Sequence, residues 1–87
     1  MKEFSYTITD PVGIHARPAG LFTKKLGEFE SAITIARADT GASCDGKKLL
    51  ALMKLKVKRN DAIIIKAEGE DEAAAIEAAQ AYLSKNL

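Results

Sequence analysis

The sequence predicts an α+β fold in which helices cover one face of an antiparallel sheet. Near the N-terminus, Phe4, Tyr6 and Ile8 alternate with polar residues, a pattern typical of a half-buried strand. From Ala16 onward, apolar residues recur at steps of three and four, which indicates a helix. Along the chain the expected order is β-α-β-β-α-β-α. The order of strands within the sheet stays open, and a ferredoxin-like arrangement also fits this pattern.

The first half of the chain is expected to form a strand, a helix and a hairpin. Pro11 and Gly13 end the first strand, and a helix starts directly after His15 and ends near Gly27. A strand over residues 31–37 and a turn then lead into a short strand near Ser43 and Cys44. The apolar face of the helix is formed by Ala19, Phe22, Thr23 and Leu26, and that of the strand by Ile33 and Ile35.

The second half is expected to form a helix, a strand and a long final helix. The second helix is predicted over residues 45–57, with positive charge on one side, because residues 47–59 are rich in lysine. The β-branched run at residues 62–67 favours a strand. The final helix is predicted within residues 68–87, with acidic residues in its first turn, Lys85 near its end and an apolar face of Ile76, Ala79 and Leu83.

Composition is typical of a small cytoplasmic protein. The 87 residues fit one domain spanning 1–87, and the 47% hydrophobic and 29% charged content is ordinary for such a domain. Cys44 is the single cysteine, so no intramolecular disulfide can form, which suits a reducing compartment. The sequence shows neither a secretory signal nor an apolar run long enough for membrane insertion. The net charge of +1 argues against a nucleic-acid partner.

The single histidine, His15, lies where a helix is expected to start, in the stretch "GIHARPAG". Free N–H groups at a helix start attract anions, and the Arg17 guanidinium adds donors that suit phosphate oxygens. Positive potential disfavours a charged ring, so His15 is expected to be neutral and nucleophilic near neutral pH. Pro18 fits the first turn of the helix. This combination is consistent with a transferable phosphoryl group, although a lone histidine at a helix start is usually a cap or a surface residue.

Other chemistry has weaker support in the sequence. A metal site is not expected, because His15 is the single histidine and Cys44 is not at ligand spacing. No Ser–His–Asp arrangement is apparent that would indicate hydrolysis. The sequence therefore predicts no metal and no cofactor.

The octapeptide "GIHARPAG", residues 13–20, resembles the active-site signature of the HPr family, the histidine-containing phosphocarriers of the bacterial sugar phosphotransferase system. The resemblance extends over nearly the whole chain and includes "LLALM" and the final helix. It implies an open-faced β-sandwich of four antiparallel strands covered by three helices. It also implies that Nδ1 of His15 receives a phosphoryl group from enzyme I, which phosphoenolpyruvate charges, and passes it to enzyme IIA, with Arg17 supporting the exchange. Such a protein is a carrier rather than an enzyme, and we expect a monomer.

Two helices are expected to supply the surface that docks these partners. On the first helix, a stripe apart from the core face contains Gly20, Leu21 and Lys24. On the second helix, Leu49, Leu50 and Met53 resemble the apolar docking patch of the family, while Leu52 and Leu55 are expected in the core. An apolar centre rimmed by the lysines at positions 24, 48 and 54 would suit a transient interface with acidic partners.

The chain departs from the family pattern at two positions. Many HPr proteins of Gram-positive bacteria carry a regulatory serine at the start of the second helix, and Lys48 occupies that place here. Val12 stands where members of the sugar system often carry a small polar residue. Val12, the hairpin "ARADTGASCDG" and "LLALM" are similar to the nitrogen-related HPr paralogue. Regulatory phosphotransfer without sugar transport is therefore one alternative, and a non-catalytic interaction module of the same fold is another.

Overall fold

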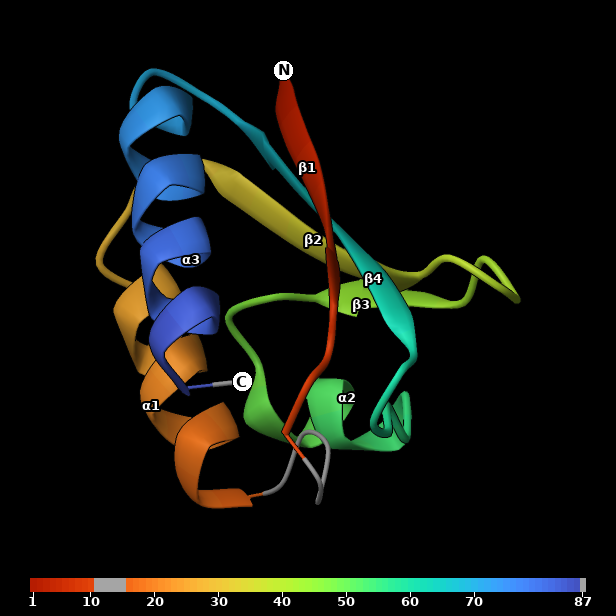
Figure 1. Ribbon diagram of the computed structural model, residues 1–87. Helices are drawn as coiled ribbons and strands as arrows, with labels where there is room; N and C mark the ends of the chain where they lie inside the picture. The colour runs from red at the N-terminus through yellow and green to blue at the C-terminus, as the bar shows by residue number, and fades with distance from the viewer. Residues whose placement is uncertain (11–15, 87) are drawn as a thin grey trace.

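A computed structural model, which describes residues 1–10 and 16–86, contains four strands in one antiparallel sheet and three helices (Figure 1). The elements, in chain order, are β1 (Lys2–Thr7), α1 (Ala16–Leu26), β2 (Ala32–Arg37), β3 (Ser43–Asp45), α2 (Leu49–Lys54), β4 (Ala62–Glu68) and α3 (Glu72–Asn86). This order and the α+β class agree with the sequence prediction. The strand order in the sheet is β1-β4-β2-β3.

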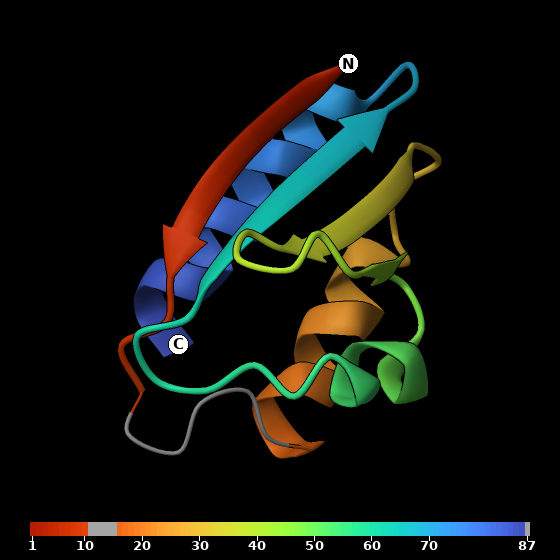
Figure 2. The ribbon, with the colours of Figure 1, turned by 90° about the vertical axis from the view of Figure 1, so that its right-hand side faces the viewer.

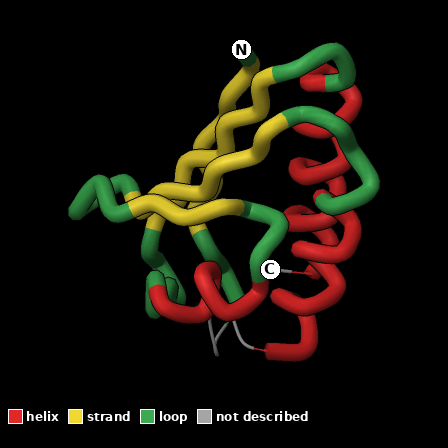
Figure 3. The backbone as a smooth tube through the Cα atoms, turned by 180° about the vertical axis from the view of Figure 1, so that it is seen from behind, coloured by secondary structure: helices red, strands yellow, loops and turns green. Residues whose placement is uncertain are grey.

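The helices cover one face of the sheet. Figure 2 looks onto the strands and shows α3 behind β1 and β4, with α1 beside it and α2 at the lower end. The view from behind in Figure 3 shows α1 and α3 on one side of the strands and the short α2 at their lower end. This arrangement is the open-faced sandwich that the sequence resemblance implied.

The alternation of side chains along the strands produces the core. In β2 and β4, Ile33, Ile35, Ile63 and Ile65 are buried, and Ile35 pairs with Ile65 across the two strands. The helices contribute their predicted apolar faces, including Phe22 and Leu83, which are fully buried. Because strand side chains alternate between faces with a period of two, the intervening residues point to the open face.

The second helix is shorter than predicted. It starts at Leu49 rather than near residue 45, because Asp45 belongs to β3 and its carboxylate accepts the Lys47 N–H at 2.9 Å. It ends at Lys54, since Lys56 takes a left-handed backbone conformation with φ of 53°. The predicted stripe of positive charge along one long helix is therefore wrong. Of the basic residues in 47–59, Lys54 alone lies within α2.

Helix α3 begins at Glu72, and the turn before it requires glycine. Gly69 has a positive φ of 155°, and a Cβ atom there would lie 2.7 Å from the Cα and Oγ atoms of Ser31. The buried Ser31 and the exposed Glu30 donate backbone N–H groups to the Asp71 carboxylate, and the Ser31 hydroxyl donates to it as well. These contacts join the start of α3 to the segment between α1 and β2.

Candidate functional site

Helix α1 starts at Ala16, as predicted, and its first turn is anchored on α3. The Tyr82 hydroxyl donates to the Pro18 carbonyl oxygen at 2.9 Å, and the rings of Phe22 and Tyr82 stack with centroids 5.2 Å apart. Burial raises the pKa of the Tyr82 hydroxyl, so it remains a donor across the physiological range. The start of α1 is therefore held in a fixed position relative to the sheet.

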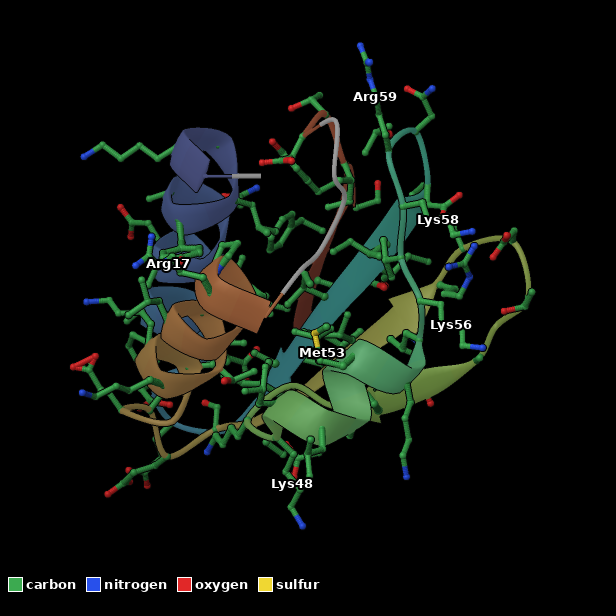
Figure 4. All side chains as sticks on the ribbon, turned by 90° about the horizontal axis from the view of Figure 1, so that it is seen from below. Arg17, Lys48, Met53, Lys56, Lys58 and Arg59 are labelled. Carbon is green, nitrogen blue, oxygen red and sulfur yellow. The ribbon has the colours of Figure 1, made fainter. Side chains whose placement is uncertain are left out.

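The residues of the "GIHARPAG" motif are only partly described. His15 lies outside the described residues, as do Val12 and Gly13. Arg17 belongs to the first turn of α1 and is exposed. Figure 4 shows Arg17 on the side of α1 opposite α2. The guanidinium is thus accessible at the helix start, but it stands apart from Met53 and Lys48.

The stripe on α1 and the start of α2 are brought together by the fold. A Cβ atom at Gly20 would lie 3.7 Å from Cδ2 of Leu49, so α1 and α2 pack closely at this point. Leu21 and Lys24 are exposed on α1. The predicted stripe on α1 and the start of α2 therefore adjoin at a junction of the two helices, and their role in docking stays a prediction.

The four large apolar residues of α2 lie in different environments. Leu50 is 77% exposed and Leu52 is 1% exposed, although they are separated by one residue. Leu49 and Met53 are half-buried and pack against the core, so only part of each side chain is accessible to a partner. Leu52 is in the core as predicted, whereas Leu55 is partly buried against it. With the 58% exposed Leu21, Leu50 is the accessible apolar part of the junction.

Lys48 directly precedes α2. Its backbone is extended, with φ of −116° and ψ of 112°, and its side chain makes no capping hydrogen bond. Lys48 is exposed and projects outward in Figure 4. The position that the sequence prediction assigned to the family's regulatory serine therefore presents an exposed lysine directly before α2.

Sequence reasoning assigned no role to the segment after α2, which presents three further cations. Lys56, Lys58 and Arg59 are exposed. In Figure 4, Lys56 lies beside the end of α2, and Lys58 and then Arg59 lie progressively farther from α2 and Met53. The high lysine content of residues 47–59 was a signal for this feature. A helix over the whole stretch was the wrong interpretation, so the place of these charges could be found only from the fold.

Two searches of the described residues bear on other functions. Across residues 1–10 and 16–86, no helix is long and apolar enough to cross a membrane. Over the same part of the chain, no group of three His, Cys, Asp or Glu side chains could hold a metal ion. Burial and then the nearby Asp45 raise the pKa of Cys44, which keeps its thiol protonated.

Comparison with known proteins identifies the family. A family model described as "PTS HPr component phosphorylation site" matches residues 2–85. The chain belongs to the HPr family of phosphocarrier proteins. It is 43% identical to the phosphocarrier protein HPr of Mycoplasma genitalium over 86 residues, which is 99% of this chain and 97% of the relative. The identity to the HPr of Mycoplasma pneumoniae is 41%, with the same coverage.

The fold of solved HPr structures agrees with that described here. A structure of a mycoplasma histidine-containing phosphocarrier protein superposes with a TM-score of 0.91 at 34% identity, covering 97% of this chain and 93% of that one. HPr-C-His from Thermoanaerobacter tengcongensis gives a TM-score of 0.90 at 32% identity, covering 98% and 93%. The predicted HPr-like sandwich and the family resemblance are both confirmed.

Proposed function

We propose that this HPr-type phosphocarrier accepts a phosphoryl group on His15 from enzyme I, which is charged by phosphoenolpyruvate, and passes it to enzyme IIA in sugar uptake. The observation that carries the proposal is the "GIHARPAG" motif, which runs directly into α1, where Arg17 is exposed in the first turn. The helix N-terminus and the guanidinium are both suited to phosphate oxygens.

The proposed chemistry requires little covalent work from the carrier. The lone pair of the His15 imidazole attacks phosphorus, the P–N bond of the donor phosphohistidine breaks, and the donor ring keeps the electron pair. In the transfer to enzyme IIA, the acceptor attacks phosphorus, the P–N bond to His15 breaks, and the His15 ring keeps the electron pair. Positioning of the reacting groups and stabilisation of the phosphoryl oxygens lower the barrier.

The α1–α2 junction is the proposed docking surface for both partners. Its accessible apolar side chains are Leu21 and Leu50, while Leu49 and Met53 are half-buried and pack against the core. Gly20 permits the close approach of the helices, and Lys24 adds an exposed charge at the rim. An apolar centre with a charged rim is the usual anatomy of a transient protein interface.

The direct test is incubation with enzyme I and labelled phosphoenolpyruvate, followed by mapping of acid-labile phosphate. We expect one label on His15, and none in the His15→Ala variant. Retention of acid-labile label in that variant would refute the site. Subsequent addition of enzyme IIA should remove the label from the wild-type carrier.

The role of Arg17 is tested by transfer rates. We expect Arg17→Ala to slow phosphoryl exchange by roughly ten- to a thousand-fold, the range for one lost contact to developing charge. Arg17→Lys should recover only part of the rate, because lysine keeps the charge but lacks the planar fork. The His15 pKa, followed by NMR, should rise when the neighbouring cation is removed. Unchanged rates and titration in Arg17→Ala would mean that the helix start acts alone.

Two alternatives keep the same fold but change the partners. Val12 and the β2–β3 hairpin favour the nitrogen-type regulatory branch, in which the acceptor would be a regulatory IIA protein and not one that serves sugar uptake. Discharge to one class of acceptor and not the other would separate these branches. A non-catalytic interaction module would acquire no label at all, and the presence of both His15 and Arg17 argues against it.

We also propose that the chain acts as one domain, residues 1–87, as a cytoplasmic monomer. Among the described residues, Met1, Leu21 and Leu50 are the large hydrophobic side chains that are exposed, so no extensive apolar face calls for a second copy. Light scattering of the purified protein tests the monomer, and cell fractionation tests the location.

A further inference from the structure

The net charge of +1 conceals a separation of charge between the two ends of the molecule. Residues 47–59 contain six of the 13 Lys and Arg residues and no acid. Residues 68–72 contain four acids and no base. The strand β4 (Ala62–Glu68) connects these segments, and its seven residues span about 20 Å. The first residue of β4 therefore lies near the basic segment, which we call the basic end of the molecule, and the last residue of β4 lies in the acidic segment at the opposite end.

The basic end includes an anchored turn, residues 56–61, which we call the basic turn. Arg37 on β2 holds it from one side, because its Nη1 donates to the carbonyl oxygens of Leu55 and Lys56, each at 3.0 Å. Nη2 of the same guanidinium bonds an Asp61 carboxylate oxygen at 3.0 Å, and that oxygen also accepts the Lys58 N–H at 2.8 Å. The turn is thus fixed through its backbone and not through its exposed cations.

The end of β1 holds the basic turn from the other side. Ile8 donates its N–H to the Asp61 carbonyl at 3.0 Å, and the Asn60 N–H donates to the Ile8 carbonyl at 2.8 Å. Within the turn, the Asp61 N–H bonds the Lys58 carbonyl at 3.0 Å. Such double anchoring fixes the backbone of the turn before any partner binds, which lowers the entropic cost of ordering this loop on association.

The cations of the basic turn have no acidic partner in the described part of the chain. Salt bridges there join Asp39 and Asp61 to Arg37, and none joins an acid to Lys56, Lys58 or Arg59. Lys56 also occupies a left-handed backbone conformation, which glycine adopts without steric cost.

We propose that the basic turn is a second docking element, which recognises an acidic surface on the proteins that exchange phosphate with this carrier. This inference rests on the proposed function and adds a second, separate surface to the α1–α2 junction. In Figure 4 the basic turn begins beside the end of α2 at Lys56 and carries Lys58 and Arg59 away from α1 and α2. The acidic opposite end favours approach of such a partner with the basic end first. Charges at an interface rim act mainly on the association rate and its salt dependence.

The test is a pair of double variants with equal net charge. Lys58→Glu/Arg59→Glu reverses two charges of the basic turn, and Lys66→Glu/Lys85→Glu reverses two exposed charges elsewhere. Association with enzyme I is measured by stopped flow between low and high salt, and urea unfolding establishes that both variants are folded. We expect the first variant to associate on the order of tenfold more slowly at low salt, with the deficit lost at high salt, and the control to resemble wild type.

Two outcomes would overturn the inference: equal slowing of both variants, which indicates net charge alone, or no slowing of the first. Failure of the proposed function gives a different result. In that case wild-type protein would carry no acid-labile phosphate after incubation with enzyme I and phosphoenolpyruvate. At saturating carrier concentration, the Lys58→Glu/Arg59→Glu variant should still be fully labelled on His15, because the reacting groups are unchanged.

Discussion

The Leu50→Ala variant tests the proposed docking surface separately from the hydrophobic core. Leu50 is 77% exposed on a six-residue helix, and Leu52 on the same helix is 1% exposed. Full burial of a leucine side chain contributes about 1.5–3 kcal/mol, so about three quarters of that, roughly 1–2 kcal/mol, is still available to a partner. Loss of this contact should weaken binding by about 5- to 30-fold.

The stability of the same variant should hardly change. A side chain this exposed removes little buried surface, and we expect a change within about 0.5 kcal/mol in the free energy of unfolding. Leu52→Ala is the matched control on the same helix, and it should cost about 2–5 kcal/mol through loss of packing and creation of a cavity. Affinity for enzyme I is measured by calorimetry, and stability by urea denaturation.

The reasoning would be refuted if Leu50→Ala bound enzyme I as tightly as wild type. It would also be refuted if Leu50→Ala were destabilised as strongly as Leu52→Ala, because the exposed fraction would then not report the role of Leu50. Leu49 is a poorer probe, because it is half-buried and packs against the core. A charge at Leu49 is expected to lower both affinity and stability, so a loss of transfer in such a variant would have two causes.

Four further predictions concern stability and modification. Gly69→Ala should destabilise the fold by at least about 1 kcal/mol, because its Cβ would meet Ser31 at 2.7 Å; a urea midpoint equal to that of wild type would contradict the clash. Hydrogen bonds from the Ser31 hydroxyl and then the Glu30 N–H hold the pKa of Asp71 below its ordinary 3.8. The ionised Asp71 carboxylate therefore stabilises the fold above that pH, and this stabilisation is lost as the pH falls below it. The difference in urea midpoint between wild type and Asp71→Asn should accordingly shrink from pH 6 to pH 3. Lys56→Gly should raise the free energy of unfolding by about 0.5–1 kcal/mol through relief of left-handed strain, and thermal melting that shows a decrease would exclude strain at this position. HPr kinase with ATP should add no phosphate at the start of α2, where Lys48 has no hydroxyl, which intact-mass measurement checks.

The periodicity of the sequence determined the elements and most of the core. Burial of Ala19, Phe22 and Leu26 on α1, and of Ile76, Ala79 and Leu83 on α3, follows directly from spacing, because one helical face must pack on the sheet. The "GIHARPAG" motif similarly placed the start of α1 at residue 16. These features depend on local geometry and hydrophobicity, which are properties of short stretches of sequence.

Contacts between distant segments decided the rest. The strand order β1-β4-β2-β3 and the end of α2 at Lys54 both depend on long-range pairing. The different environments of Leu50 and Leu52 depend on where α1 and the sheet lie around α2, and no pattern within "LLALM" specifies this. The role of Arg37 follows the same logic, because it binds backbone 18 and 19 residues away. Sequence alone reports that positive charge is plentiful in residues 47–59, whereas the fold determines which of these charges are exposed and lie on an anchored turn.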